Sequence, residues 1–337
     1  MAKMEIAIDL GTSFTSIYVS GNGVVLHEPS VIAYHCSGGR RSVLAAGNEA
    51  YAMIGKVPDK TKIVCPIVDG AVKFPEDCAK MLSEFMKKIL PQSYIIKPKV
   101  SAIVGVPTGV TVDERKMYEE VLMRAGIDEI SMVSNIMLAA VGIELPISAT
   151  YGGFIASVGG GVTDIAVVSL CGVVTGCSIN IGGDMIDKTL SDSISGICQL
   201  KVDLGTVRRV REQISSLIRN DCATATVSGI DLQTKMIRSQ SVSAGQIYNA
   251  VFVYYKNIID AMQSVINTCS PAVAAEIQKN GVNIVGGGSK IPGLARIAGE
   301  KLKLRVHIPQ SPQYATVLGA GKLLSDRSLL EEIIWHA

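Results

Sequence analysis

Two short segments far apart in this chain follow the same pattern, and this repetition constrains the fold more than any other feature. Residues 9–15 (DLGTSFT) can be laid on residues 157–163 (SVGGGVT). An apolar stretch precedes each segment and an alternating stretch, 16–20 or 164–170, follows it, which is the pattern of two strands joined by a tight turn. The repeat predicts two related α/β domains, each opening with a glycine-containing hairpin, that face one cleft.

The remaining elements favour the same fold class. Residues 4–10 and 100–106 are short apolar runs that read as strands. Residues 76–90 and 113–125 place their apolar side chains on one face of a helix, and a second strand-rich stretch begins near Tyr151. Strands, then helices, then strands again are the order of an α/β protein.

The amino-acid composition predicts a folded protein and argues against several other classes of protein. The 337 residues are 48% hydrophobic and 18% charged, which allows about two well-packed domains and excludes disorder. The net charge of +2 gives no electrostatic reason to expect a nucleic-acid partner. We expect neither a signal peptide nor a spanning helix, because the first residues enter a strand pattern and no apolar run is long enough. The 8 cysteines form no C-x-x-C, so we expect no zinc site or disulfide framework and a reducing cytosol.

Three turns of small residues follow predicted strands and indicate phosphate binding. They are residues 11–13 (GTS), 159–161 (GGG) and 286–289 (GGGS), the last between a strand at 282–285 and a helix that starts near Pro292. Glycine lets backbone N–H groups approach an anion closely, and a helix N-terminus adds partial positive charge. One such turn is ordinary, whereas three in one chain, two of them related, predict a nucleotide site.

Two acids accompany the related turns. Asp9 ends the strand before the first turn, and Asp164 follows the second turn. Either carboxylate suits a Mg²⁺ ion, bound directly or through water, beside a phosphate. The alternative for Asp9 is a side chain that caps its own turn. The chain has no G-x-x-x-x-G-K-[ST], and no G-x-G-x-x-G follows its first strand, so neither a P-loop nor a dinucleotide fingerprint is present.

These motifs resemble the actin/sugar-kinase/DnaK-type superfamily, and most closely the MreB family of bacterial actins. The resemblance rests on IDLGTSFT (8–15), VGGGVTD (158–164) and VGGGS (285–289), and further stretches extend it over essentially the whole chain: 23–34, 69–82, 105–116, 178–190, 271–294 and 315–324. It implies an actin-like fold, with two duplicated α/β domains around a cleft for ATP or ADP and Mg²⁺. The implied subdomains are IA (1–32, 67–145 and 312–337), IB (33–66), IIA (146–180 and 244–311) and IIB (181–243).

The resemblance assigns nucleotide contacts residue by residue. Thr12, Ser13 and Phe14 correspond to the first phosphate turn, with Phe14 where MreB proteins usually have Asn. The second turn and the adenosine side correspond to Gly159, Gly160 and Gly161 and to Gly287, Gly288 and Ser289. A helix that carries E-E-I-K in the family reads Arg208-Arg209-Val210-Arg211 here. Arg211 keeps the final basic residue, whereas Arg208 reverses a charge expected near the ribose or adenine.

Two further departures concern hydrolysis. MreB proteins have an Asp before the second turn, where this chain has Ser157, and a Glu at the helix that faces the phosphate, where it has Asn135. Neither side chain is an anionic acceptor or a general base. We therefore expect ATP binding with weak or absent ATPase activity.

The resemblance also implies an assembly and a location. MreB proteins polymerise into filaments, and one loop of theirs inserts apolar residues into the bilayer. Tyr94, Ile95 and Ile96 occupy that loop here, although Ile95 and Ile96 alternatively begin the following strand. The implied partners are other copies of the chain, MreB paralogues and cell-wall synthesis proteins of the membrane. The implied location is the inner face of the cytoplasmic membrane, and the implied function is to determine cell shape.

Three other functions stay open at this point. A small-molecule kinase of the same superfamily shares the core but needs a substrate pocket, and the chain shows no insertion large enough to build one. A DnaK-type chaperone needs a substrate domain, which we do not find before the last residue, Ala337. A regulatory paralogue that binds nucleotide without hydrolysing it would fit Ser157 and Asn135.

Overall fold

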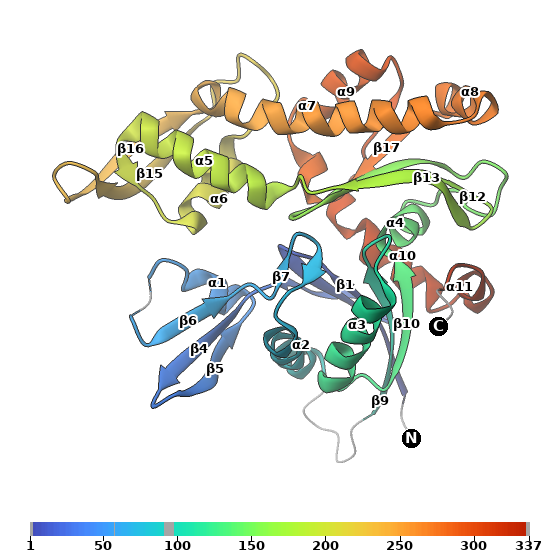
Figure 1. Cartoon of the computed structure of the whole chain (residues 1–337), viewed down its shortest axis with the longest axis horizontal. Coiled ribbons are helices and arrows are strands. Elements are labelled where there is room, and N and C mark those ends of the chain that lie inside the picture. The colour runs from blue at the N-terminus through green and yellow to red at the C-terminus, as the bar shows by residue number, and fades with distance from the viewer. Residues whose placement is uncertain (1–2, 57, 91–97, 335–337) are drawn as a thin grey trace.

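The computed structural model describes residues 3–56, 58–90 and 98–334, and in these residues two five-stranded sheets repeat one topology (Figure 1). The strand orders are β10-β9-β1-β2-β3 and, read in the same sense, β18-β17-β11-β12-β13. In each order the first three strands pair in parallel, and the last three pair antiparallel. The strands of the first sheet are β1 (Lys3–Leu10), β2 (Phe14–Val19), β3 (Gly23–Pro29), β9 (Lys99–Val106) and β10 (Glu129–Ser134). Those of the second are β11 (Gly153–Val158), β12 (Thr163–Ser169), β13 (Gly172–Ile179), β17 (Val282–Val285) and β18 (Val306–His307).

Two smaller sheets extend the halves as separate arms (Figure 1). The arm of the first half has the strand order β5-β4-β6, and the arm of the second half has the order β14-β15-β16. The first arm contains β4 (Ile32–Ser37), β5 (Arg40–Ala46), the helix α1 (Asn48–Ala52) and β6 (Thr61–Val64). The second contains β14 (Leu200–Lys201), β15 (Thr224–Asp231) and β16 (Ile237–Ser243). A short pair, β7 (Ile67–Val68) and β8 (Ala71–Val72), leads back from the first arm.

The longer helices cover the two halves. The helices of the first half are α2 (Pro75–Ile89) and α3 (Val112–Arg124). Those of the second half are α5 (Gly183–Cys198), α6 (Leu204–Ile214), α7 (Ala244–Thr268), α8 (Pro271–Asn280), the 3₁₀ turn η1 (Gly287–Lys290) and α9 (Leu294–Leu302). The chain then returns through η2 (Pro312–Tyr314) to α10 (Ala315–Leu323) and α11 (Arg327–Ile333). In the ranges that the structure describes, we find no helix with the length and hydropathy of a membrane span.

A third core lies between the two sheets and joins the halves. It is built on α4 (Asn135–Gly142) and α10, which pack against each other in the centre of the molecule (Figure 1). Ala7 and Ile103 reach this core from the first sheet, and Ile155 and Val285 reach it from the second. Each half has its own separate core as well. The two domains therefore share one pair of packed helices.

Glycine makes this helix pair unusually close. A methyl group added to Gly319 of α10 would lie 1.8 Å from the carbonyl oxygen of Leu138 and 2.8 Å from the backbone nitrogen of Gly142. A methyl group added to Gly142 of α4 would lie 1.9 Å from the carbonyl oxygen of Ala315. The backbones touch at two points, so neither position accepts a side chain.

The predicted elements agree with this architecture, and the differences have local causes. The predicted α/β class and the duplication are confirmed by the two sheets of equal topology. The helix expected at 76–90 is Pro75–Ile89, with Pro75 in its first turn. The helix expected near Pro292 begins instead at Leu294, because the segment before it forms η1. The proposed membrane-contact residues Tyr94, Ile95 and Ile96 lie outside the described residues.

Candidate functional site

The two glycine turns have the same geometry. In the first, the N–H of Gly11 donates to the carbonyl of Phe14 over 3.1 Å; in the second, the N–H of Gly159 donates to the carbonyl of Val162 over 2.9 Å. A side chain at Gly11 would clash with the same Phe14 oxygen at 2.7 Å, and one at Gly159 with the Val162 oxygen at 2.8 Å. The repeat found in the sequence is thus a repeated turn, and each turn requires glycine at its first position.

Both turns open into one cavity of about 490 Å³ between the domains. Most of the residues assigned from the sequence line it: Asp9, Thr12, Ser13, Phe14, Asn135, Ser157, Gly159, Gly160, Gly161, Asp164, Arg211, Gly287 and Gly288. The cavity is therefore assembled from three small-residue turns and two acids, as the sequence predicts.

Two assigned residues are placed differently. Ser289 is 2% exposed, and its hydroxyl donates to the carbonyl of Gly286 over 2.8 Å, so it supports the third turn from inside. Arg208 is not among the described residues that line the cavity, because its guanidinium is held by acids on α5.

Each hairpin carries one acid and one serine in the same cross-strand pair. Asp9 on β1 faces Ser16 on β2, whereas Ser157 on β11 faces Asp164 on β12. The acid thus lies before the turn in the first domain and after it in the second. The two carboxylates enter the cavity from opposite strands of related hairpins, and a Mg²⁺ ion held by one or two carboxylates and by substrate phosphates fits this arrangement.

Burial keeps these acids from ionising easily. It raises the pKa of Asp9 to about 7 and also raises that of Asp164, although a hydrogen bond from Ser178 partly opposes the second shift. One carboxylate oxygen of Asp164 has no hydrogen-bond partner among the described residues. Because a buried carboxylate oxygen without a partner is costly, Asp164 favours a cation beside it, and Asp9 lines the same cavity.

The raised pKa of Asp9 gives a testable pH dependence. The native state keeps this proton to a higher pH than the unfolded chain, whose Asp has a pKa near 3.8. The native state binds more protons between these values, so the free energy of unfolding of the nucleotide-free protein falls as pH rises from about 4 to about 7. We expect Asp9→Asn to flatten this part of the profile in thermal unfolding and to raise Tm above pH 7. The exposed Asp59→Asn is the control, and an unchanged slope in Asp9→Asn would contradict the assignment.

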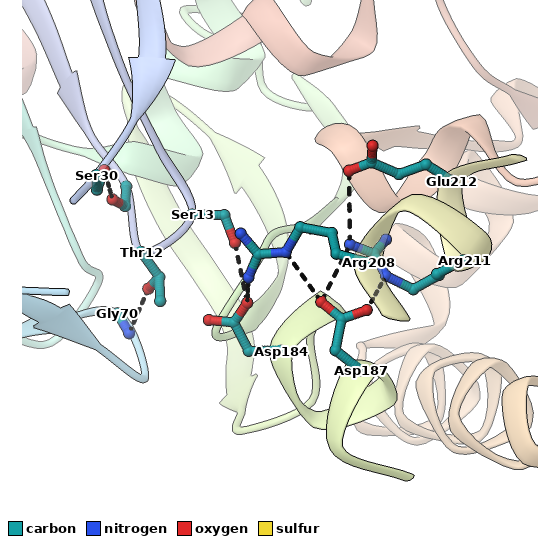
Figure 2. A network of polar contacts seen from close by, with 10 residues as sticks. Thr12, Ser13, Ser30, Gly70, Asp184, Asp187, Arg208, Arg211 and Glu212 are labelled. Atoms are coloured by element: carbon teal, nitrogen blue, oxygen red, sulfur yellow. Dashed lines mark hydrogen bonds and ion pairs between the residues drawn. The ribbon is translucent and has the colours of Figure 1, made fainter. Parts of the chain in front are cut away.

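Side chains of the first glycine turn bond to their own domain and, across the cleft, to helix α5 (Figure 2). The hydroxyl of Thr12 accepts a hydrogen bond from the N–H of Gly70 over 2.9 Å, and the hydroxyl of Ser13 donates to Asp184 at the start of α5 over 3.2 Å. A side chain on Gly160 would lie 2.0 Å from the Ser13 hydroxyl. The first turn therefore contacts the second turn and the helix behind it.

The helix α5 is bonded to the second turn as well. The N–H groups of Gly183 and Asp184 donate to the carbonyls of Gly159 and Gly160 over 3.2 and 2.8 Å. The turn and the helix N-terminus therefore form one rigid unit that faces the first turn across the cavity.

Several cavity side chains carry unused hydrogen-bonding capacity. Buried oxygens of four residues that line the cavity have no partner among the described residues: Asn135, Asp164, Ser215 and Gln313. Buried polar atoms in native proteins are nearly always satisfied, so this concentration indicates a polar ligand or water in the cavity. Asn135 begins α4 and lies so close to β9 that a side chain on Gly105 would meet its amide oxygen at 2.2 Å.

Sequence reasoning missed an aromatic group beside the first turn. Phe14 stacks on His27 with ring centroids 4.6 Å apart, and Tyr314 meets His27 edge-on at 4.9 Å. The hydroxyl of Ser16 is 2.9 Å from His27 Nδ1. Burial and then Lys290 lower the pKa of His27, which favours its neutral form. The cross-strand pairing of β2 with β3 creates this stack, and His27 carries no motif that would reveal it.

The positive charges assigned to the nucleoside side belong to an ion-pair network (Figure 2). Arg208 bonds Asp184 over 2.7 Å and Asp187 over 3.0 Å, and Arg211 bonds Asp187 over 2.5 Å. Asp187 is fully buried and forms ion pairs with both arginines. Arg211 also lines the cavity, together with Glu212.

Comparison with known proteins settles the family. The model of the MreB/Mbl protein family matches residues 3–332. The chain belongs to the MreB/Mbl family. The cell shape-determining protein MreB of Escherichia coli (strain K12) is 32% identical over 327 residues, which is 96% of this chain and 94% of that protein. The cell shape-determining protein Mbl of Bacillus cereus (strain ATCC 10987 / NRS 248) is 31% identical over 97% of both chains.

The fold of this MreB/Mbl family member has a solved counterpart. The crystal structure of MreB 5 of Spiroplasma citri bound to AMPPNP superposes with a TM-score of 0.89 at 25% identity. The alignment covers 98% of this chain and 99% of that one. The actin-like fold is therefore confirmed for the part of this family member that the structure describes.

Proposed function

We propose that this MreB/Mbl family member binds ATP or ADP with Mg²⁺ in the interdomain cavity and polymerises into filaments. The observation that carries the proposal is the convergence of two geometrically equal glycine turns and two acids, the half-buried Asp9 and the buried Asp164, on one cavity. A volume of about 490 Å³ is in the range of small-molecule sites. The related MreB 5 was crystallised with AMPPNP, which supports the same class of ligand here.

The roles of the residues follow from their chemistry. Backbone N–H groups of the two turns would bind the phosphates, and the hydroxyl of Thr12, which accepts a hydrogen bond from Gly70, keeps its own hydrogen to donate. Asp9 and Asp164 would hold Mg²⁺, which offsets the negative charge of the phosphates. Arg211 and the third turn would contact the nucleoside.

Hydrolysis would be weak, since Ser157 and Asn135 replace the acids of the family at the positions beside the phosphate. Neither side chain takes up a proton from an attacking water at neutral pH. This observation favours a second, narrower function within the family, in which the chain copolymerises with or regulates a paralogue that hydrolyses ATP efficiently.

An exposed apolar hairpin supports self-assembly. The β15–β16 hairpin exposes Met236 by 69% and Ile237 by 85%, with Ile230 and Leu232 nearby on the same hairpin. Apolar side chains gathered at one tip favour burial against another molecule. A second copy of the chain is the partner that the family implies.

Sedimentation with Mg-ATP tests the proposed function. The unmodified chain should bind a fluorescent ATP analogue and form pelletable polymer. The variant Met236→Glu/Ile237→Glu should lose polymer yet keep nucleotide binding, because the hairpin tip does not line the cavity. Absence of nucleotide binding by the unmodified chain would refute the proposal. Sugar-dependent release of ADP without polymer would favour the kinase function.

We also propose peripheral attachment to the inner face of the cytoplasmic membrane. The supporting sequence is Tyr94, Ile95 and Ile96, followed by Lys97 and Lys99. Burial of two isoleucines contributes at most ~3–6 kcal/mol per subunit, and each lysine about 1 kcal/mol near anionic lipid. A filament would multiply these weak contacts.

Liposome pelleting checks this attachment. We expect filaments to pellet with vesicles that contain anionic lipid, and Ile95→Ser/Ile96→Ser to lose most of that binding while still polymerising. Equal pelleting of the two proteins would dismiss the proposal.

A further inference from the structure

We propose that Arg208 is a positioning residue that fastens the two arms of the molecule across the mouth of the nucleotide cavity and so slows nucleotide release. The proposal rests on the nucleotide binding proposed above. It concerns a residue that does not line the cavity and that the resemblance placed at the ribose or adenine instead.

Arg208 is anchored on its own side by two acids. Its guanidinium nitrogens bond Asp184 and Asp187 of α5 over 2.7 and 3.0 Å, and its side chain is only 13% exposed. Asp184 also accepts the hydrogen bond from Ser13 of the first phosphate turn. The arginine is therefore linked through one carboxylate to the loop expected to hold the phosphates (Figure 2).

The same guanidinium reaches the opposite arm. Its carbon lies 5.6 Å from the centre of the ring of Tyr51, which belongs to α1 of the first arm. This geometry is that of a cation–π contact, which is stronger when it is shielded from water. A second contact joins the same two arms, because a side chain on Gly55 would lie 2.9 Å from the Cβ of Asp203, the residue that caps α6.

These contacts bridge two arms that otherwise belong to separate sheets. Arg208 lies on α6 of the second half, and Asp203 directly precedes that helix. Tyr51 lies on α1 of the first arm, and Gly55 lies between α1 and β6. A nucleotide that enters or leaves the cleft needs the arms to part, and parting them separates Arg208 from Tyr51. Arg208 thus has two effects: it neutralises acids behind the phosphates, and it fastens the cleft.

Substitutions can separate these effects. Tyr51→Ala removes the contact across the cleft together with some packing against the small core of the first arm, whereas Arg208→Ala removes that contact and leaves Asp184 and Asp187 with less positive charge. The adjacent Arg209 is exposed and bonds Thr206 on its own helix, so Arg209→Ala is the matched control. Tyr51→Phe keeps the ring and the packing but loses the hydroxyl that interacts with Arg208, so it should release nucleotide more slowly than Tyr51→Ala.

The measurement is the dissociation rate of a fluorescent ATP analogue in a stopped-flow chase. We expect Tyr51→Ala to speed release about 5- to 30-fold, Arg208→Ala to speed it at least as much, and Arg209→Ala to leave it unchanged. The double variant Arg208→Ala/Tyr51→Ala should release no faster than Arg208→Ala, because the two residues act through one contact. Unchanged release in Tyr51→Ala, or effects that multiply in the double variant, would overturn the proposal.

A nucleotide-free measurement distinguishes failure of this inference from failure of the proposed function. Small-angle X-ray scattering should give a larger radius of gyration for Tyr51→Ala and Arg208→Ala than for the unmodified chain and Arg209→Ala. Equal radii would overturn the fastening role even if the unmodified chain binds no nucleotide. Circular dichroism checks that each variant is folded.

Discussion

Placing carboxylates at the two positions where the family has them is expected to raise phosphate release by about 10²–10⁴-fold. The variant is Ser157→Asp/Asn135→Glu. Both residues line the cavity, and Ser157 lies opposite Asp164 in the second hairpin. Hydrolysis requires a water positioned for in-line attack and an acceptor for its proton, and the unmodified side chains provide hydrogen bonds without a base.

The control variant introduces side chains of the same size and polarity as Asp and Glu but without their negative charge. Ser157→Asn/Asn135→Gln should release phosphate as slowly as the unmodified chain under polymerising conditions. Rapid release by the unmodified chain would refute the prediction directly. If Ser157→Asp/Asn135→Glu releases phosphate no faster than the unmodified chain, another residue limits hydrolysis. One example is Phe14, whose ring stacks on His27 beside the first turn.

Adding one methyl group between the domains is expected to cost about 3 kcal/mol of unfolding free energy. The variant is Gly319→Ala in α10, where the new carbon would lie 1.8 Å from the carbonyl oxygen of Leu138. The obstacle is backbone, which a change of rotamer does not relieve. The helices α4 and α10 would have to move apart, and the core between the two sheets would lose its packing.

A second glycine on a helix gives the matched control. Gly196 of α5 has no atom within 4 Å of an added methyl group, so Gly196→Ala should be neutral or stabilise by about 0.5–1 kcal/mol through helix propensity. Urea unfolding of both variants checks the prediction. Equal midpoints for Gly319→Ala and Gly196→Ala would show that the helix pair adjusts without cost.

The fold was predictable from sequence where local pattern and repetition agree. Residues 9–15 and 157–163 share a glycine turn that needs no distant contact, and Pro75 marks the start of its helix within the first turn. The three small-residue turns, each placed directly after a predicted strand, also indicated a single nucleotide cavity. These features depend on residues close together in the chain, where backbone geometry decides the structure.

The rest of the site depends on partners far apart in the sequence. Arg208 occupies a position of a helix motif of the family. Its guanidinium nevertheless forms ion pairs with Asp184 and Asp187 on the neighbouring helix and does not line the cavity. Ser289 belongs to a glycine turn but bonds inward to Gly286. Neither outcome follows from spacing along the chain, because each is set by which charged or polar group tertiary packing brings closest.

The backbone contact between α4 and α10 limits how the molecule can move. Where Gly142 and Gly319 touch, the helices have no compressible side chains between them. Direct approach of the domains is blocked at this point, and separation would open the shared core. The motion that remains is a hinge rotation of one domain relative to the other about the α4–α10 contact. A small rotation at the α4–α10 contact becomes a large displacement at the tips of the two arms. A partner that binds these tips would therefore respond to whether the cleft is open or closed.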